Sequence, residues 1–224
     1  MNDAKQKLAL AEKKAKELFD MVEGLGLIAP GKSESQLAGE VVETARKHFG
    51  IEKFWHKKIV RTGPNTINSY SADPPDLVIQ MNDILFLDFG PIFEGWEADL
   101  GRTYVLGSDP LKLKLKQDVE AAWHEAKAWY DEKTAITGAA CFTYLNELAE
   151  KYGWEFGGEI GGHIVGHFPH EQLDPGDLGL DVHPDNHSDI LQPDKDGNAR
   201  HWILEVQFVD RVNNIGAFFE QLLN

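Results

Sequence analysis

A chain of 224 residues that includes 12 Phe and 6 Trp can form a substantial core, in one large domain or two small ones. The formal net charge of −15 argues against nucleic acid or an anionic membrane surface as a partner. There is no apolar run long enough to span a membrane and no secretory signal, and the single cysteine, Cys141, suits a reducing compartment, so we expect a cytoplasmic protein.

Two amphipathic helices are predicted at the start of the chain. Apolar residues recur at helical spacing through residues 4–25. Ser33 and Gln36 match the capping-box pattern, which predicts a second helix that continues to about Phe49. Gly50 fits the C-terminal end of that helix.

Residues 84–106 read as strand, turn and strand, which is the pattern of a β-hairpin. A tight loop at residues 93–94 would place Asp88 opposite Asp99, and facing Cβ atoms in an antiparallel pair lie about 4.5–5.5 Å apart. Two carboxylates at that distance repel each other, so a divalent metal between them is the simplest prediction. The alternative is that Arg102 pairs with one aspartate while the other is solvated.

The second half of the chain repeats this order of elements. Helices are predicted over residues 110–133 and 139–152. Residues 157–201 are rich in Gly, His, Pro and Asp and are interpreted as loops around a site, with short strands among them as an alternative. Two further strands, at residues 201–209 and 215–223, close the chain.

Each half therefore ends in a hairpin that carries one acid on each arm. The acids are Asp88 and Asp99 in the first hairpin and Glu205 and Glu220 in the second. Two helices precede each of these blocks. We predict an α+β fold made of a duplicated unit with pseudo-twofold symmetry, in which helices cover a curved antiparallel sheet and residues 1–224 form a single domain.

The acids and neighbouring histidines form a candidate metal site. The candidate ligands are Asp88, Asp99, Glu205, Glu220 and one or more of His163, His167 and His170. Four buried carboxylates without cations would be strongly destabilising, whereas two divalent ions would balance their charge. Oxygen ligands with an imidazole suit Mn²⁺ or Co²⁺, and also Fe²⁺ or Zn²⁺.

The motifs around these residues resemble the pita-bread metallopeptidase family, which includes methionine aminopeptidase, aminopeptidase P, prolidase and the non-peptidase creatinase. The similar segments are Leu87-Asp88-Phe89-Gly90, Asp99 with Arg102-Thr103, Gly161-Gly162-His163, Pro169-His170-Glu171, Leu204-Glu205 and Phe219-Glu220. The resemblance covers essentially the whole chain and fills five metal-ligand positions in the family's order. It implies the pita-bread fold and a catalytic centre with two metal ions.

Carried over by position, the resemblance assigns a role to each ligand. Asp99 and Glu220 would bridge the two ions. Asp88 would bind one ion, and His163 and Glu205 would bind the other. In the family a second histidine, seven residues after the first, helps to polarise the scissile carbonyl.

His170 matches that second histidine by spacing, and Glu205 would also carry the catalytic proton. The segment that ends in His183 resembles one that holds the second histidine in prolidase-like members, so His183 is an alternative to His170. We favour His170 because of its seven-residue distance from His163.

Three residues are predicted on the substrate side of the site: Tyr70, His167 and His183. Tyr70 or Ser71 aligns with a further family histidine, and Tyr70 would supply a hydrogen bond in its place. We interpret His56, next to Trp55, as a buried histidine outside the catalytic site.

The sequence therefore predicts a metal-dependent aminopeptidase or dipeptidase that acts on short peptides, with Xaa-Pro peptides as one substrate class. Two alternatives stay open: a creatinase-like hydrolase of non-peptide C–N bonds, and a peptide-binding protein without catalysis. The expected partner is a small peptide, with no nucleic acid and no membrane. The oligomeric state is left open, with a homodimer as one option.

Overall fold

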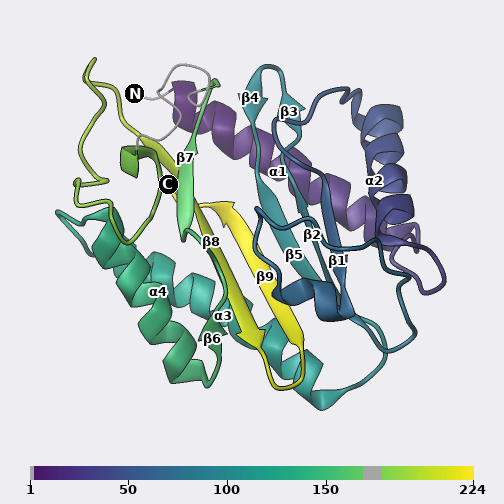
Figure 1. Ribbon diagram of the computed structural model, residues 1–224. Coiled ribbons are helices and arrows are strands. Elements are labelled where there is room, and N and C mark those ends of the chain that lie inside the picture. The colour runs from purple at the N-terminus through teal and green to yellow at the C-terminus, as the bar shows by residue number, and fades with distance from the viewer. Residues whose placement is uncertain (1–2, 169–177) are drawn as a thin grey trace.

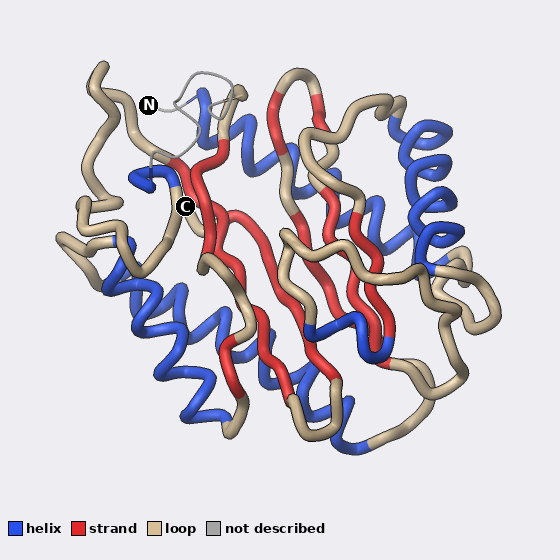
Figure 2. Tube along the Cα trace, in the orientation of Figure 1, coloured by secondary structure: helices blue, strands red, loops and turns tan. Residues whose placement is uncertain are grey.

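The computed structural model describes residues 3–168 and 178–224, and its centre is an antiparallel sheet with helices behind it (Figures 1 and 2). The described helices are α1 (Asp3–Gly24), α2 (Glu34–Phe49), α3 (Pro110–Asp131) and α4 (Gly138–Tyr152), with 3-10 turns η1 (Gly63–Ile67) and η3 (Leu178–Leu180). The described strands are β1 (Ile59–Thr62), β2 (Ile84–Phe89), β3 (Ile92–Phe93), β4 (Trp96–Glu97), β5 (Leu100–Val105), β6 (Glu155–Phe156), β7 (Gly162–Val165), β8 (His201–Asp210) and β9 (Ile215–Leu222). None of the described helices is long and apolar enough to cross a membrane.

The strands of the main sheet follow the order β1-β2-β5-β9-β8-β6, and β7 pairs with β8 beside this path. Strands β3 and β4 form a small separate ribbon. Every one of these strand pairs is antiparallel. No parallel crossover is therefore needed to connect the described strands, which agrees with the α+β prediction.

The helix boundaries follow local capping chemistry. The Ser33 side chain accepts a hydrogen bond from the Gln36 backbone N–H, and the Gln36 side chain accepts one from the Ser33 backbone N–H, so the predicted capping box is confirmed. Gly50 ends α2 in the left-handed region, with φ of 66°. Asp109 caps α3 by accepting from the Leu111 backbone N–H.

Alternate residues of each central strand face opposite sides of the sheet. On β2, one set packs with α1 and α2 in an apolar core: Leu85, Leu87 and Phe89. The other set lines a cavity: Phe86 and Asp88. The same alternation in β8 and β9 packs apolar residues against α3 and α4 and places Glu205 and Glu220 on the cavity side. The helices therefore cover one face of the sheet, and the acids lie on the other.

Two hydrophobic cores correspond to the two halves of the chain. One packs α1 and α2 against β1, β2 and β5, and the other packs α3 and α4 against β8 and β9. The halves meet where Gly101 on β5 pairs with Glu220 on β9. A Cβ atom at Gly101 would lie 2.4 Å from the Phe218 ring, so only glycine allows this close approach. The predicted duplicated α+β unit is confirmed.

The register of the first hairpin differs from the prediction. The turn lies at Glu94 and Gly95, whose φ values of 53° and 85° suit a tight hairpin, and not at residues 93–94. Asp88 consequently pairs with Gly101, and Asp99 lies between β4 and β5. The predicted turn would have required a positive φ at a buried phenylalanine, which bulky side chains disfavour.

Candidate metal centre

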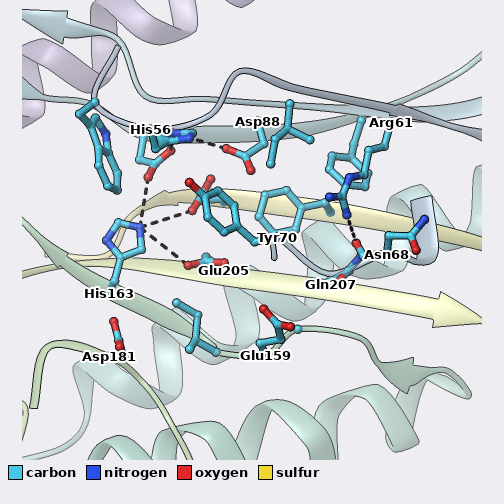
Figure 3. A pocket seen from close by; sticks show the side chains of 18 residues that line it. His56, Arg61, Asn68, Tyr70, Asp88, Glu159, His163, Asp181, Glu205 and Gln207 are labelled. Atoms are coloured by element: carbon cyan, nitrogen blue, oxygen red, sulfur yellow. Dashed lines mark hydrogen bonds and ion pairs between the residues drawn. The ribbon is translucent and has the colours of Figure 1, made fainter. Parts of the chain in front are cut away.

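The five predicted ligands come from separate segments and line the same cavity (Figure 3). Their positions in chain order are Asp88 on β2, Asp99 before β5, His163 on β7, Glu205 on β8 and Glu220 on β9. Glu205 and Glu220 pair directly across the β8–β9 ladder. Like charges at such a position are unfavourable unless positive charge lies beside them.

His163 faces three of these acids. Its Nε2 atom lies 3.1 Å from Asp99 Oδ2. It also lies 3.8 Å from Glu205 Oε1 and 3.8 Å from Glu220 Oε1. Its Nδ1 atom lies 2.9 Å from the backbone carbonyl of Ile164. Since a carbonyl oxygen only accepts hydrogen bonds, Nδ1 carries a proton and Nε2 is left to face the acids. This arrangement is typical of a metal-binding imidazole.

His56 lies on the other side of Asp99, contrary to our interpretation of this residue from the sequence. Its Nε2 atom is 3.0 Å from Asp99 Oδ1 and 3.6 Å from Asp88 Oδ1, and its side chain is 5% exposed. A Cβ atom at Gly90 would lie 2.2 Å from the His56 ring, so the glycine after the β2 strand makes room for this histidine. That glycine is a signal in the sequence that could have indicated the contact.

The electrostatics of the acid cluster are governed by burial. Burial raises the pKa of Asp88 to about 7 and the pKa of Glu205 to about 8. Burial, with the charges of Asp99 and Asp88 added, raises the pKa of Glu220 well above its usual value. These carboxyl groups therefore hold protons near neutral pH unless another positive charge replaces those protons.

Asp99 and the two histidines form the charged part of the cluster. Burial alone would raise the pKa of Asp99, but the neighbouring His56 and His163 lower it below its usual value. Burial alone would lower the pKa of His56, but the charges of Asp99 and Asp88 outweigh it and raise that pKa to about 9. Burial alone would lower the pKa of His163, but its hydrogen bond to Asp99 and the nearby Glu220 and Glu205 carboxyl groups outweigh burial and raise that pKa.

The donor atoms fit divalent cations. Among the described residues, two groups of three could each hold an ion: His56 with Asp88 and Asp99, and Asp99 with His163 and Glu220. Within each group the donor atoms lie within 4.8 Å of one another. The buried Glu220 Oε2 atom has no hydrogen-bond partner among the described residues, which leaves an oxygen available for a cation. Carboxylate oxygens with imidazole nitrogens are the donors that Mn, Fe, Co and Zn accept.

Among the described residues, Arg102 forms no ion pair with Asp88 or Asp99, so the alternative prediction that Arg102 pairs with one of these aspartates is wrong. Its guanidinium donates to the backbone carbonyls of Gly101 and Glu220 and to the side chain of Gln221. It also lies over the Phe219 ring, 3.9 Å from the ring centroid. The arginine therefore holds β5 to β9 from the helix side of the sheet.

The cavity above the acids has a volume of about 240 Å³. Apolar side chains form much of its wall, among them Trp55, Phe86 and Phe218. Tyr70 also lines the cavity and is 47% exposed; its role on the substrate side stays a prediction. Asp181, which sequence reasoning missed, lines the cavity too and forms an isolated β-bridge with His163. Asp181 lies in the segment ending in His183 that resembles a family segment, so that motif is the signal that could have indicated its place near the site.

The other predicted histidines are placed differently. His167 lies beside Trp96 with ring centroids 5.7 Å apart, at the β3–β4 ribbon and not among the residues that line the cavity. The His183 Nδ1 atom accepts a hydrogen bond from the Asp185 backbone N–H at 3.1 Å, and His183 is also not among the lining residues. His170 lies outside the described residues, so its predicted role stays a prediction.

The chain is similar in sequence to known metallopeptidases. The model of metallopeptidase family M24 matches residues 6–196 of this chain. A Mycoplasma pneumoniae protein assigned by name to the Xaa-Pro aminopeptidases is 31% identical over 98 residues, which cover 42% of this chain and 27% of that protein. The chain therefore spans well under two thirds of this relative.

Two solved structures share the fold. The X-Pro aminopeptidase of Thermotoga maritima has a TM-score of 0.76 and 21% identity, covering 97% of this chain and 60% of that one. A methionine aminopeptidase from the same organism has a TM-score of 0.69 and 18% identity, covering 97% of this chain and 90% of that one. These matches confirm the predicted pita-bread fold. With the family model matching most of its length, the chain belongs to metallopeptidase family M24.

Proposed function

We propose that this chain is a hydrolase that uses two divalent cations to release the N-terminal residue of short peptides, with Xaa-Pro peptides as the first candidates. The observation that carries the proposal is the pair of donor groups that share Asp99 on the cavity side of the sheet. Membership of the M24 family supports a peptide substrate, and the relative named as a Xaa-Pro aminopeptidase supports the proline preference.

In this proposal Asp99 and Glu220 would be shared by two ions, Asp88 would hold one of them, and His163 and Glu205 would hold the other. Mn²⁺ or Co²⁺ is the preferred occupant, with Fe²⁺ or Zn²⁺ as alternatives. When bound, such a pair supplies Lewis-acid activation of a water molecule and of the scissile carbonyl. The charges support this assignment, because two divalent ions balance four carboxylates that otherwise retain protons.

Glu205 is the proposed proton carrier of the reaction. Its side chain is 16% exposed, against 3% for Glu220, so it is the more accessible of the two paired acids. It can take a proton from the attacking water and pass it to the leaving amine. His170 is the proposed donor to the carbonyl oxygen, on its spacing from His163, and His183 stays the alternative.

The cavity supports a small peptide as the substrate. Its volume of about 240 Å³ is below the ~300–1,000 Å³ that is typical for drug-sized ligands, so it suits one end of a short chain. Aromatic walls formed by Trp55, Phe86 and Phe218 can contact an apolar residue such as proline without supplying a polar partner. Tyr70, exposed in part, can donate a hydrogen bond to the peptide from the cavity wall.

The test is hydrolysis of a peptide series with Mn²⁺ or Co²⁺ added. We expect release of the N-terminal residue, fastest from Xaa-Pro peptides, and loss of that activity in Glu205→Gln. Glu155→Gln, an exposed acid on β6, is the matched control and should retain the activity. Absence of hydrolysis of any peptide by the metal-loaded wild type would overturn the proposal and favour the creatinase-like or binding alternatives.

His170→Ala and His183→Ala separate the two candidates for the second histidine. A donor aimed at developing charge is worth about 10²–10³ in rate. We therefore expect His170→Ala to lower kcat by that factor with metal content unchanged, and His183→Ala to have little effect. The reverse ranking would assign the role to His183.

The location and assembly of the protein remain predictions from the sequence. A single cysteine suits the cytoplasm, and we infer that the protein acts there. A homodimer stays an option that size-exclusion chromatography with light scattering would test.

A further inference from the structure

Among the described residues, His56 is the histidine near the acids that the family resemblance does not assign. It comes from the segment before β1, 43 residues before Asp99 in the chain. Its Nε2 atom nevertheless lies 3.0 Å from Asp99 Oδ1 and 3.6 Å from Asp88 Oδ1. All three side chains are at least nine-tenths buried, with exposed fractions of 5% for His56, 3% for Asp99 and 9% for Asp88.

The two imidazoles are arranged alike around Asp99. His56 Nε2 lies 3.0 Å from one carboxylate oxygen of Asp99, and His163 Nε2 lies 3.1 Å from the other. A carboxylate that bridges two cations gives one oxygen to each of them. Each oxygen of Asp99 therefore faces its own imidazole nitrogen.

The geometry points to His56 as a metal ligand: its Nε2 atom binds the cation held by Asp88 and Asp99, so that each of the two ions has one imidazole. This inference rests on the proposed two-metal function and adds a sixth protein ligand to it. In the family pattern, the ion held by Asp88 has only carboxylate oxygens as protein ligands. The inference gives that ion a nitrogen ligand as well.

His56 is held in this position by its neighbour Trp55 and by the hairpin. The Trp55 backbone N–H donates to the Gly90 carbonyl, and its indole Nε1–H donates to the Ala98 carbonyl, both at 3.0 Å. The Trp55 ring lies against the rings of both His56 and His163, with centroids 4.6 and 5.2 Å away. These contacts fix the imidazole next to the two aspartates before any ion binds, as a preorganised ligand requires.

The surroundings of the two imidazoles differ in one respect. The His163 Nδ1 atom is held by a backbone carbonyl, whereas the His56 Nδ1 atom has no hydrogen-bond partner among the described residues. Loss of such a supporting hydrogen bond typically lowers metal affinity by about 10–100-fold. We therefore expect the ion on the His56 side to be the more weakly bound of the two.

Zinc titration of the metal-free wild type and of His56→Gln tests the inference. The wild type should bind two ions in two steps of different affinity. In His56→Gln the weaker step should lose at least about 10-fold in affinity while the tighter step is retained. His48→Gln, an exposed histidine on α2, is the matched control and should titrate like the wild type.

X-ray absorption of the zinc-loaded proteins provides a second readout that does not depend on activity. We expect about one imidazole nitrogen per zinc in the wild type and about half that in His56→Gln. The wild-type value decides the question even if His56→Gln fails to fold. About half an imidazole per zinc in the wild type, or unchanged titration of His56→Gln, would overturn the role of His56 while leaving the two-metal proposal in place. A wild type that binds no zinc, manganese or cobalt would instead overturn the proposed function itself.

Discussion

The Asp99 carboxylate lies between two imidazoles, and its surroundings decide whether protons or cations balance the cluster. Asp88, Glu205 and Glu220 are buried acids with raised pKa values, so in the metal-free protein they keep protons that exposed acids would lose. Cations and protons therefore compete for the same oxygens.

This competition predicts how the stability of the metal-free protein depends on pH. The pKa of Asp88 is raised from 3.8 to about 7 on folding, so between those values the folded state holds a proton that the unfolded state lacks, and stability falls as the pH rises. The pKa of His56 is raised from 6.5 to about 9, so its contribution is complete below pH 6.5 and is lost as the pH rises through 9. The contributions of Asp88 and His56 to the stability of the folded state therefore both decrease as the pH rises.

Urea unfolding of the EDTA-treated protein at several pH values between 5 and 9 measures how the free energy of unfolding depends on pH. The free energy of unfolding should decrease steadily over that window, and saturating Mn²⁺ should reduce the decrease because the ions replace the protons. A metal-free protein that becomes more stable towards pH 9 would contradict the burial of these carboxyl groups.

Cys141 gives a second prediction at the level of one residue. It is 2% exposed in the core, and burial raises the pKa of its thiol to about 12. Because the thiolate is the reactive form, the folded protein should react with an aromatic disulfide reagent far more slowly than the guanidinium-unfolded protein at pH 8. Equal rates for the two states would show that the thiol is accessible.

The sequence indicated the acids but not all of their partners. Asp88, Asp99, Glu205 and Glu220 were predictable because each lies in a strand pattern with a recognisable motif. His56 was not, because its contact with Asp99 depends on the packing of Trp55 beside Gly90, which no periodicity records. The place of His163 was predictable from its glycine-rich motif, whereas its bridge to Asp181 was not.

At the scale of single elements, the four helices and the strands β2, β5, β8 and β9 were predicted, whereas β7 lies in residues interpreted chiefly as loops and the hairpin register was wrong. Apolar periodicity located β2, β5, β8 and β9 to within a few residues. The turn, however, was placed one residue early, because the prediction did not use the preference of a tight turn for glycine at a positive φ. A shift of one residue in the turn moved Asp88 from opposite Asp99 to opposite Gly101.

Glycine on β7 provides a prediction about an element. Gly162 has a φ of 141°, and a Cβ atom there would lie 2.1 Å from the Ile203 carbonyl oxygen on β8. Because backbone cannot move aside as a side chain can, Gly162→Ala should destabilise the protein by about 1–3 kcal/mol in chemical denaturation. It should also weaken metal binding, since His163 is the next residue.

Gly39→Ala is the matched control for this substitution. Gly39 lies inside α2, is exposed, and has no atom within 4 Å of the place a Cβ would occupy. Alanine there should stabilise the protein by about 0.5–1 kcal/mol, because it has the higher helix propensity. A Gly162→Ala protein as stable as Gly39→Ala would show that β7 and β8 are not packed as described.

At the scale of the whole molecule, the candidate ligands come from both halves of the chain. Asp88 and Asp99 belong to the first half, and His163, Glu205 and Glu220 belong to the second. The pseudo-twofold order of helices and hairpins was predictable from the sequence, since it repeats in the chain. The way the halves meet, through Gly101 and Glu220, was not, because it depends on tertiary packing.

Cations that bind ligands from both halves should raise the unfolding temperature. A ligand that binds only the folded state stabilises it by about 2.7 kcal/mol at 100 times its Kd. Calorimetry should therefore show a higher and sharper transition with Mn²⁺ or Co²⁺ than in EDTA, and chelation should reverse the change. Identical transitions with and without metal would mean that the ions do not bridge the halves.

Metal content of the purified protein tests the central claim most directly, because Asp99 belongs to both candidate ion sites. After loading with Mn²⁺ or Co²⁺ and removal of free ions, plasma mass spectrometry should find two ions per wild-type chain and almost none in a folded Asp99→Ala variant. A wild type that retains fewer than one ion per chain, or an Asp99→Ala variant that still holds two, would contradict a two-metal centre built around Asp99.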